Sequence, residues 1–202
     1  FTTDTELLTN LLNAVLKFPE PQRLTAVTVK NPQILNEDVT GKWIVLDVLA
    51  TAADGRQYNV EMQARQYVFY PNRMVYYIAK LYAGQLQTGE NYNLLKPVIG
   101  IHFLDYELYP KRSAYHFCFE LREQRYHSLC LTPDLSLHLL ELPKFEKQRV
   151  KGAHDELSEW LHFFNHAPQE EKQQMRTHYQ NPLIHKAFGV LERLSADKQM
   201  RQ

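Results

Sequence analysis

Two carboxylates beside an expected sheet hairpin are the residues of this chain that could best carry out chemistry. Asp47 lies in the apolar run Trp43–Ala50, and Glu61 opens the pattern Glu61-x-Gln63-x-Arg65. A carboxylate in apolar surroundings needs a partner, and a divalent cation can satisfy two carboxylates at once. Two acids gathered with polar groups on a sheet are the components of a metal-dependent phosphodiesterase site.

The spacing within the second pattern decides which side chains could act together. Glu61, Gln63 and Arg65 are two residues apart, so they share one face of a continuous strand. Val60 and Met62 point to the other face, which is apolar. We therefore expect one chemical face and one core face along this strand.

Asp47 must point to the same face as Glu61 if the two acids are to form a site. Residues 53–56 give a hairpin signal between the two segments. A two-residue turn would place Asp47 opposite Met62, on the wrong face. A three-residue loop over 54–56 would place it opposite Gln63, on the right face, and a bulge would have the same effect. The sequence leaves this register open.

Hydrophobic periodicity predicts the elements that hold these residues. Helices are expected over residues 4–17, 72–88, 157–165, 168–179 and 182–195, and strands over 24–30, 42–51, 57–64, 97–104, 115–122 and 135–142. The order predicts one α/β domain with a mixed sheet, followed by a C-terminal helical segment.

Composition limits the classes of function. The 202 residues contain 23 Lys+Arg and 23 Asp+Glu, so a nucleic-acid surface must be local. Cys118 and Cys130 lack a CxxC spacing and are expected to be free thiols, which fits a reducing, cytoplasmic compartment. No stretch approaches the roughly 18 apolar residues of a membrane span. No zinc site is expected among the histidines.

Motifs along almost the whole chain, in order, resemble the PD-(D/E)XK nuclease family transposases of the recombination-promoting nuclease (Rpn) group. The most specific block runs from residue 73 to 99. The matching stretches are Leu46-Asp47-Val48, Asn59-Val60-Glu61-Met62-Gln63, Arg73-x-x-Tyr76-Tyr77, Lys80-Leu81-Tyr82-Ala83-x-Gln85-Leu86-x-x-Gly89-Glu90-x-Tyr92-x-x-Leu95-x-Pro97-Val98-Ile99 and Glu141-Leu142-Pro143-Lys144-Phe145.

The resemblance implies a fold and an activity. The fold is an α/β restriction-endonuclease-like core with a mixed central sheet flanked by helices, plus C-terminal helices. Residues 1–150 would form the nuclease-like domain, and residues 151–202 a helical segment packed on it or following it. The implied activity is cleavage of DNA that depends on Mg²⁺ or Mn²⁺, with Asp47 and Glu61 as metal ligands.

Other residues have candidate roles beside these two acids. Gln63 stands where the general superfamily pattern has the catalytic lysine, and glutamine carries no positive charge. Arg65 could supply that charge from the same strand face, and Lys80 is a second candidate. Helical spacing places Arg73 and Lys80, seven residues apart, on one face, where they could contact DNA phosphates. A solvated helix face explains the same spacing equally well. Glu6 is the candidate for the acid that such folds often place on their first helix, although it points away from the apolar stripe of that helix and a capping role already explains it.

Two hypotheses follow. The first is a Mg²⁺-dependent DNA endonuclease of transposase or recombination-promoting type. The second is a catalytically weak or inactive nuclease-fold module that binds DNA or another protein, which the glutamine at position 63 and the zero net charge favour. The sequence does not fix the oligomeric state, and we keep a homodimer as one option.

Overall fold

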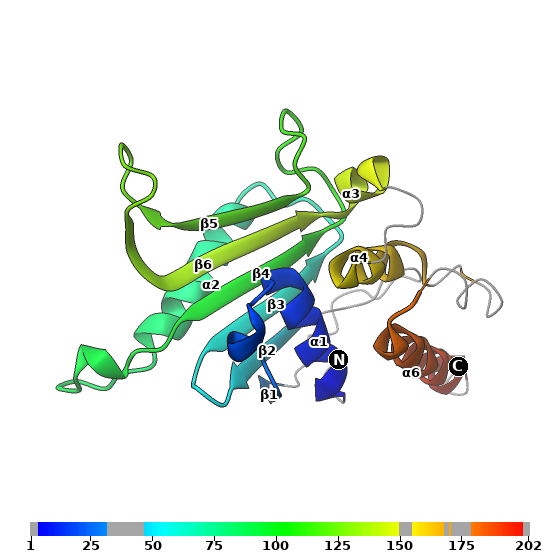
Figure 1. The fold of residues 1–202 in the computed structure, drawn as a ribbon, viewed down its shortest axis with the longest axis horizontal. Coiled ribbons are helices and arrows are strands. Elements are labelled where there is room, and N and C mark those ends of the chain that lie inside the picture. The colour runs from blue at the N-terminus through cyan, green and yellow to red at the C-terminus, as the bar shows by residue number, and fades with distance from the viewer. Residues whose placement is uncertain (1–3, 32–46, 150–154, 168–169, 171–178, 200–202) are drawn as a thin grey trace.

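A mixed sheet of six strands forms the centre of the molecule (Figure 1). The computed structural model describes residues 4–31, 47–149, 155–167, 170 and 179–199. The strands are β1 Val27–Asn31, β2 Asp47–Ala52, β3 Gln57–Gln63, β4 Val98–Leu104, β5 His116–Arg122 and β6 Cys130–Glu141. The helices are α1 Thr5–Leu16, α2 Tyr70–Ala83, α3 Leu142–Gln148, α4 Glu156–His166 and α6 Pro182–Gln199, with short 3-10 helices at Glu20–Gln22 and Tyr92–Leu94.

The order of the strands across the sheet is β1-β2-β3-β4-β6-β5. The first three strands form an antiparallel meander, and β3, β4 and β6 pair in parallel. Strand β5 closes the sheet as an antiparallel edge strand. The predicted α/β class with a mixed sheet flanked by helices is therefore confirmed.

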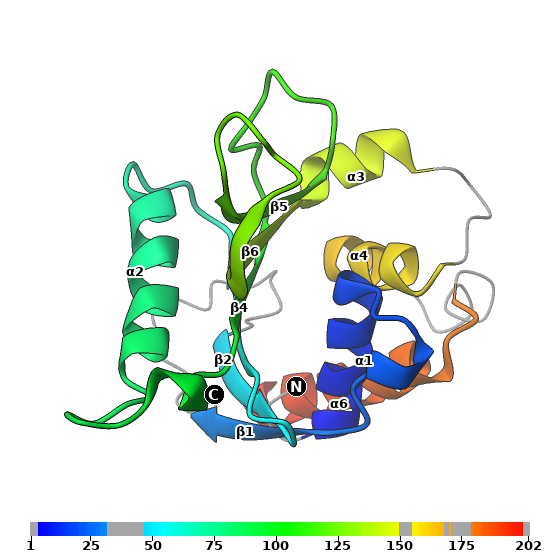
Figure 2. The same ribbon diagram turned by 60° about the vertical axis from the view of Figure 1, so that its left-hand side comes forward.

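Helices cover the sheet on both faces. Helix α2 lies on one face, and α1, α4 and α6 lie on the other (Figure 2). The larger core lies under α1, α4 and α6, where the indole N–H of Trp160 also donates to Asn10 Oδ1 at 2.8 Å. The smaller core lies under α2. The C-terminal helices thus complete the main core of the protein.

Helix α2 packs very close to the central strand. Every residue of β4 is buried, as expected for a strand covered on both faces. A Cβ at Gly100 would lie 2.6 Å from Leu137 Cδ2 and 3.1 Å from Ile78 Cγ2. Only a residue without a side chain leaves Ile78 of α2 room at this point.

The β2–β3 turn sets the register of the two acids. The turn covers residues 53–55, because the Ala52 N–H donates to the Arg56 carbonyl at 2.9 Å. Gly55 takes a φ of 91°, as a three-residue hairpin loop requires. Asp47 consequently pairs with Glu61. The sequence offered Met62 or Gln63 as the partner of Asp47, and both were wrong. The loop has three residues, but it begins at residue 53 and not at residue 54.

Several boundaries differ from the expected ones. Helix α2 ends at Ala83 with Gly84 as its cap, not near Gly89. Strand β6 begins earlier than expected, and Leu142 starts a helix with a proline in its first turn. Residues 42–46 and most of the expected helix 168–179 lie outside the described residues.

Two further expectations concern the compartment of the protein. Among the described residues, no helix has the length and apolar character needed to span a membrane. Cys118 and Cys130 are free thiols, as predicted.

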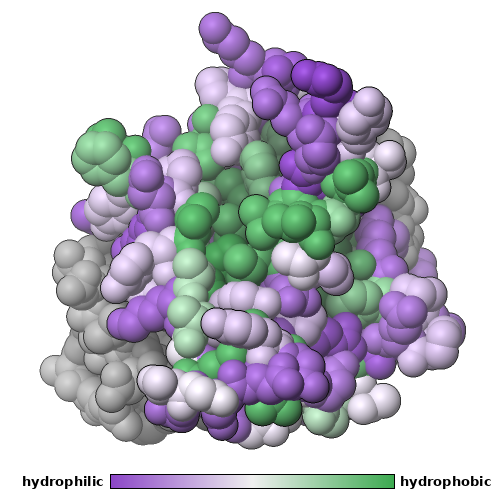
Figure 3. All heavy atoms as spheres, turned by 90° about the vertical axis from the view of Figure 1, so that its left-hand side faces the viewer, coloured by the Kyte–Doolittle hydropathy of each residue, from purple (hydrophilic) through white to green (hydrophobic). Residues whose placement is uncertain are grey.

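Strand β5 leaves part of the sheet uncovered. Its side chains Phe119 and Leu121 are exposed, as is Leu131 at the start of β6. Apolar side chains gather on the side of the molecule that lies at the left in Figure 1, around a hollow rimmed by polar residues (Figure 3). Helix α2 therefore shields only part of this sheet face.

A buried ion pair fixes the start of α3 to the loop after β4. Lys144 Nζ lies 2.6 Å from Glu141 Oε2, and the two side chains are 5% and 0% exposed. Glu141 Oε1 accepts the N–H groups of Leu108 and Tyr109 at 3.1 and 2.9 Å, and Lys144 donates to the Tyr109 carbonyl at 2.6 Å. The ammonium group and the two backbone N–H groups thus compensate the charge of the buried carboxylate.

Replacing Glu141 should destabilise the fold strongly. Glu141→Ala leaves the buried Lys144 ammonium without its carboxylate, so we expect the free energy of unfolding to fall by about 3–5 kcal/mol. Urea unfolding followed by circular dichroism measures this. The control is Glu107→Ala, which removes an exposed ion pair with Lys147 and should change stability little. Equal losses in the two variants would contradict the role given to burial.

Candidate functional site

An open cavity of about 460 Å³ lies between α2 and strands β2 and β3. Both carboxylates singled out in the sequence line it. The sheet contributes Asp47, Leu49, Gln57, Asn59 and Glu61, and the helix side contributes Arg73, Tyr77, Lys80, Leu81, Gly84 and Gln85.

Helical spacing explains which residues of α2 reach the cavity. Arg73, Tyr77 and Lys80 are separated by four and three residues, so they share one helical face. Met74 and Ile78, one residue further on, are buried against the sheet instead. The predicted common face of Arg73 and Lys80 therefore opens on the two acids.

Asp47 and Glu61 stand directly opposite each other across β2 and β3, so their side chains share one sheet face. Like charges in this arrangement are unfavourable. Burial raises the pKa of Asp47, the nearby Glu61 carboxylate raises it further, and the Arg73 guanidinium opposes both. Among the described residues, the Asp47 carboxylate has no hydrogen-bond or salt-bridge partner, so the Arg73 charge acts on it without direct contact. A bound cation would relieve this unfavourable pairing.

Glu61 is buried and held on both of its oxygens. The Asn59 amide donates to Oε1 at 3.3 Å, and the Tyr70 hydroxyl donates to Oε2 at 3.2 Å. Asn59 comes from the same face of β3, and Tyr70 is the first residue of α2. These two donors fix the direction of the carboxylate towards the cavity.

His102 extends this chain of hydrogen bonds below Tyr70. Its Nδ1 lies 3.0 Å from the Tyr70 hydroxyl oxygen, and burial followed by the Arg73 charge lowers the pKa of His102 to about 3. The imidazole is therefore neutral at pH 7. Since the single proton of the Tyr70 hydroxyl is donated to Glu61, the hydroxyl oxygen accepts from His102 when that ring carries its proton on Nδ1. The chain runs from His102 through Tyr70 to Glu61.

Sequence reasoning missed the three residues that support Glu61. Asn59 could have been found, because it lies two residues before Glu61 on one strand face. His102 lies beside Glu61 only through the parallel register of β3 and β4. Tyr70 reaches it only through the position of α2. Neither of these placements has a local signal in the sequence.

Gln63 and Arg65 do not complete the site as expected. Strand β3 ends at Gln63, whose amide donates to the Arg65 carbonyl at 3.1 Å and which does not line the cavity. Arg65 lies beyond the strand end and is exposed. The expected unbroken face through Arg65 was wrong, because the strand stops two residues short of it.

Glu6 lies far from these acids. It belongs to α1, which covers the opposite face of the sheet (Figure 2). Its carboxylate accepts a hydrogen bond from Lys186 Nζ at 2.6 Å. The placement of Glu6 as an extra acid of the site was therefore wrong, and its contact ties α1 to α6.

The donor set of the cavity suits a hard divalent cation. Asp47 and Glu61 offer carboxylate oxygens on one face, and no histidine or cysteine lines the cavity among the described residues. Oxygen ligands favour Mg²⁺ or Mn²⁺ over softer metals. The residues present thus fit the predicted ion.

Comparison with known proteins now adds to this geometry. The family described as PD-(D/E)XK nuclease family transposase matches residues 2–202. The chain belongs to this family. Searches of the curated proteins and of the solved structures found no match. Membership confirms the resemblance drawn from the motifs and supports a nuclease-type function.

Removing the Tyr70 hydroxyl should weaken metal binding at Glu61. In Tyr70→Phe the carboxylate loses one orienting donor, and we expect the affinity for Mn²⁺ to fall about 10–100-fold. His102 also loses the acceptor for its buried N–H, so stability should fall by about 1–3 kcal/mol. Isothermal titration calorimetry and urea unfolding measure these two effects.

Tyr58→Phe is the matched control for this variant. Tyr58 is also fully buried on β3, but its hydroxyl points to the other face and finds no hydrogen-bond partner among the described residues. Its removal should leave both Mn²⁺ affinity and stability close to wild type. If Tyr70→Phe binds Mn²⁺ as tightly as Tyr58→Phe, the support of Glu61 by Tyr70 has no bearing on the metal.

Proposed function

We propose that the chain is a DNA endonuclease that depends on Mg²⁺ or Mn²⁺. The observation that carries the proposal is the direct pairing of Asp47 with Glu61 on the face that lines the cavity. Two paired carboxylates without a cation oppose folding, so their position is best explained by a ligand that they bind. Family membership makes a nucleic-acid phosphodiester the substrate of choice.

Asp47 and Glu61 would hold the ion. When bound, a divalent ion supplies Lewis-acid chemistry that stabilises the negative charge developing on a phosphodiester under attack by water. Asn59 and Tyr70 hold Glu61 in one orientation, which keeps its oxygens aimed into the cavity. His102 stays neutral and fixes Tyr70 from below.

Positive charge would come from α2. Arg73 and Lys80 line the cavity opposite the acids and can bind the phosphates on either side of the cleaved bond. The Arg73 guanidinium lies 5.4 Å from the ring of Tyr77, a contact that limits its movement. Lys80 takes the task that lysine has in the general superfamily pattern, since Gln63 carries no charge. Arg65, exposed beyond the strand, becomes the weaker candidate.

Cleavage of supercoiled plasmid tests the proposal. With Mg²⁺ or Mn²⁺ present, wild type should nick the plasmid, and Asp47→Asn and Glu61→Gln should each lower the rate at least about 100-fold, because each removes a ligand that positions transition-state charge. Glu107→Gln, which removes a partly exposed carboxylate outside the cavity, serves as the control. Nicking by both site variants at the wild-type rate would assign the activity to another site or a contaminant.

A second candidate is a nuclease-fold module that binds DNA without cutting it. The observation in its favour is Gln63, an uncharged residue in the lysine position that does not line the cavity. This candidate would be supported if the wild-type protein bound DNA but did not nick it in the presence of Mg²⁺ or Mn²⁺.

Both candidates predict that DNA binding depends on α2. Each phosphate contact contributes about −0.9 to the slope of log affinity against log salt. The double variant Arg73→Ala/Lys80→Ala should therefore flatten that slope by about 1.8 in fluorescence-anisotropy titrations. Lys111→Ala/Arg112→Ala removes equal charge away from the cavity and should leave the slope unchanged. Equal flattening by both double variants would place the DNA elsewhere, and a wild-type slope near zero would exclude DNA as the partner.

A further inference from the structure

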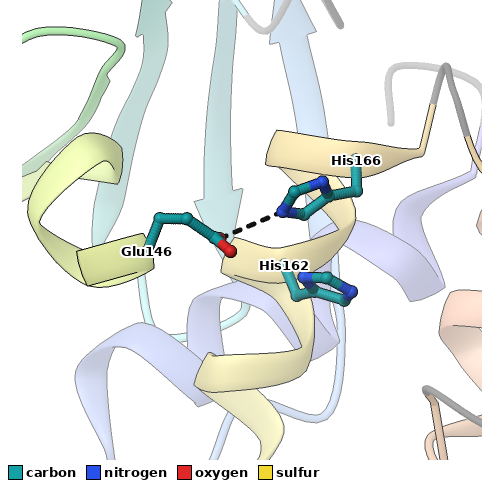
Figure 4. A group of neighbouring side chains, drawn as sticks. All are labelled: Glu146, His162 and His166. Carbon is teal, nitrogen blue, oxygen red and sulfur yellow. Dashed lines mark ion pairs between the residues drawn. The ribbon is translucent and has the colours of Figure 1, made fainter. Parts of the chain in front are cut away.

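A second group of ligating side chains lies between α3 and α4. Glu146 of α3 faces His162 and His166 of α4 (Figure 4). One ligand atom from each residue lies within 4.8 Å of the other two. The group is separate from the proposed nuclease site, since α4 covers the opposite face of the sheet from α2.

The helix places the two histidines together. They are four residues apart, one turn of α4, and their ring centroids lie 4.4 Å apart. The His-x-x-x-His spacing was a signal that could have predicted a metal site. The expectation that no zinc site exists among the histidines overlooked it.

Carboxylates stand next to both rings. Glu146 Oε2 lies 3.0 Å from His166 Nε2, and Glu170 Oε1 lies 3.3 Å from His162 Nε2. The side chains of His162 and Glu170 are 6% and 7% exposed, whereas those of His166 and Glu146 are 35% and 41% exposed. The group therefore has a buried half and a half that solvent can reach.

Ion pairs and hydrogen bonds alone would also produce the contacts of each ring with its carboxylate. The observation that points to an ion is the convergence of three ligand atoms from two helices on one place.

We propose that Glu146, His162 and His166 bind a transition-metal ion of the Zn²⁺ class. Two imidazole nitrogens and one carboxylate oxygen are the ligands that zinc takes in proteins, whereas Mg²⁺ prefers oxygen alone. Ligand atoms around a tetrahedral zinc ion are roughly 3.3 Å apart, so small rotations of these side chains close the site. Water on the exposed side completes the shell.

Glu170 acts as a positioning residue in this site. It engages Nε2 of His162 and so can hold the ring while Nδ1 serves the ion. The Tyr179 hydroxyl in turn donates to Glu170 Oε2 at 2.6 Å. The bound metal would join α3 to α4 and so tie the C-terminal helices to the end of the sheet.

Cobalt(II) is the probe that tests the site in the full chain. The background variant Asp47→Asn/Glu61→Gln, with excess Mg²⁺ present, keeps the nuclease site from contributing. After metal removal with a chelator, one equivalent of Co²⁺ should give the visible absorption of a four-coordinate ion, and Zn²⁺ should abolish it. In the same background, His166→Asn and Glu146→Gln should each weaken the affinity for Co²⁺ at least about 10-fold. Both side chains are partly exposed, so these variants should fold.

His127→Asn is the matched control, because it removes an exposed histidine between β5 and β6. It should bind Co²⁺ as the background does. Zn²⁺ should also raise the melting temperature of the background and not that of His166→Asn. The proposal fails if no saturable absorption band forms, or if His166→Asn and His127→Asn bind alike, and the group is then an ion-pair cluster only. Because the background lacks the nuclease ligands, this outcome is independent of plasmid nicking.

Discussion

The pairing of Asp47 with Glu61 across β2 and β3 is the constraint on which the rest of the site depends. The side-chain period of a strand is two, so a shift of one residue in this register would turn Asp47 into the core. The short turn over residues 53–55 prevents that shift, with Gly55 in the left-handed conformation that the turn requires. A loop conformation six residues from Asp47 thus decides whether the two acids can meet.

Helix α2 positions the other groups of the candidate site around the paired acids. Its buried side packs over β4, which is possible because Gly100 leaves room for Ile78. Its open side presents Arg73 and Lys80 across the cavity from the carboxylates. The first residue of the same helix, Tyr70, donates to Glu61. One helix therefore positions the cations, supports one metal ligand and forms a wall of the cavity.

The neutral residues around Glu61 and the cations of α2 have different roles. Asn59, Tyr70 and His102 supply donors without charge, so they orient the carboxylate and leave its negative charge for a metal ion. A lysine or arginine in their place would form an ion pair and compete with the metal. The α2 cations lie across the cavity, where a phosphate could reach them.

Local sequence patterns predicted the helices and strands well. They predicted less well which residues from distant parts of the sequence come together. The continuous apolar run of β4 and the polar face of β3 were readable because burial and alternation act within a few residues. The same kind of reasoning singled out the acids and the α2 cations, which line one cavity in the structure. The three-residue loop was expected one residue too late in the chain, since this short sequence is compatible with several types of turn. His102 lies beside Glu61 because β3 and β4 pair in parallel, and the residues next to His102 in the sequence give no signal of that pairing.

The location of a bound metal ion tests the central claim most directly. Crystals grown with millimolar Mn²⁺ and measured at the manganese absorption edge would show the ion by anomalous scattering. We predict a peak within coordination distance, about 2.0–2.6 Å, of carboxylate oxygens from both Asp47 and Glu61. A well-occupied manganese ion elsewhere in the chain, with none between these two acids, would contradict the account.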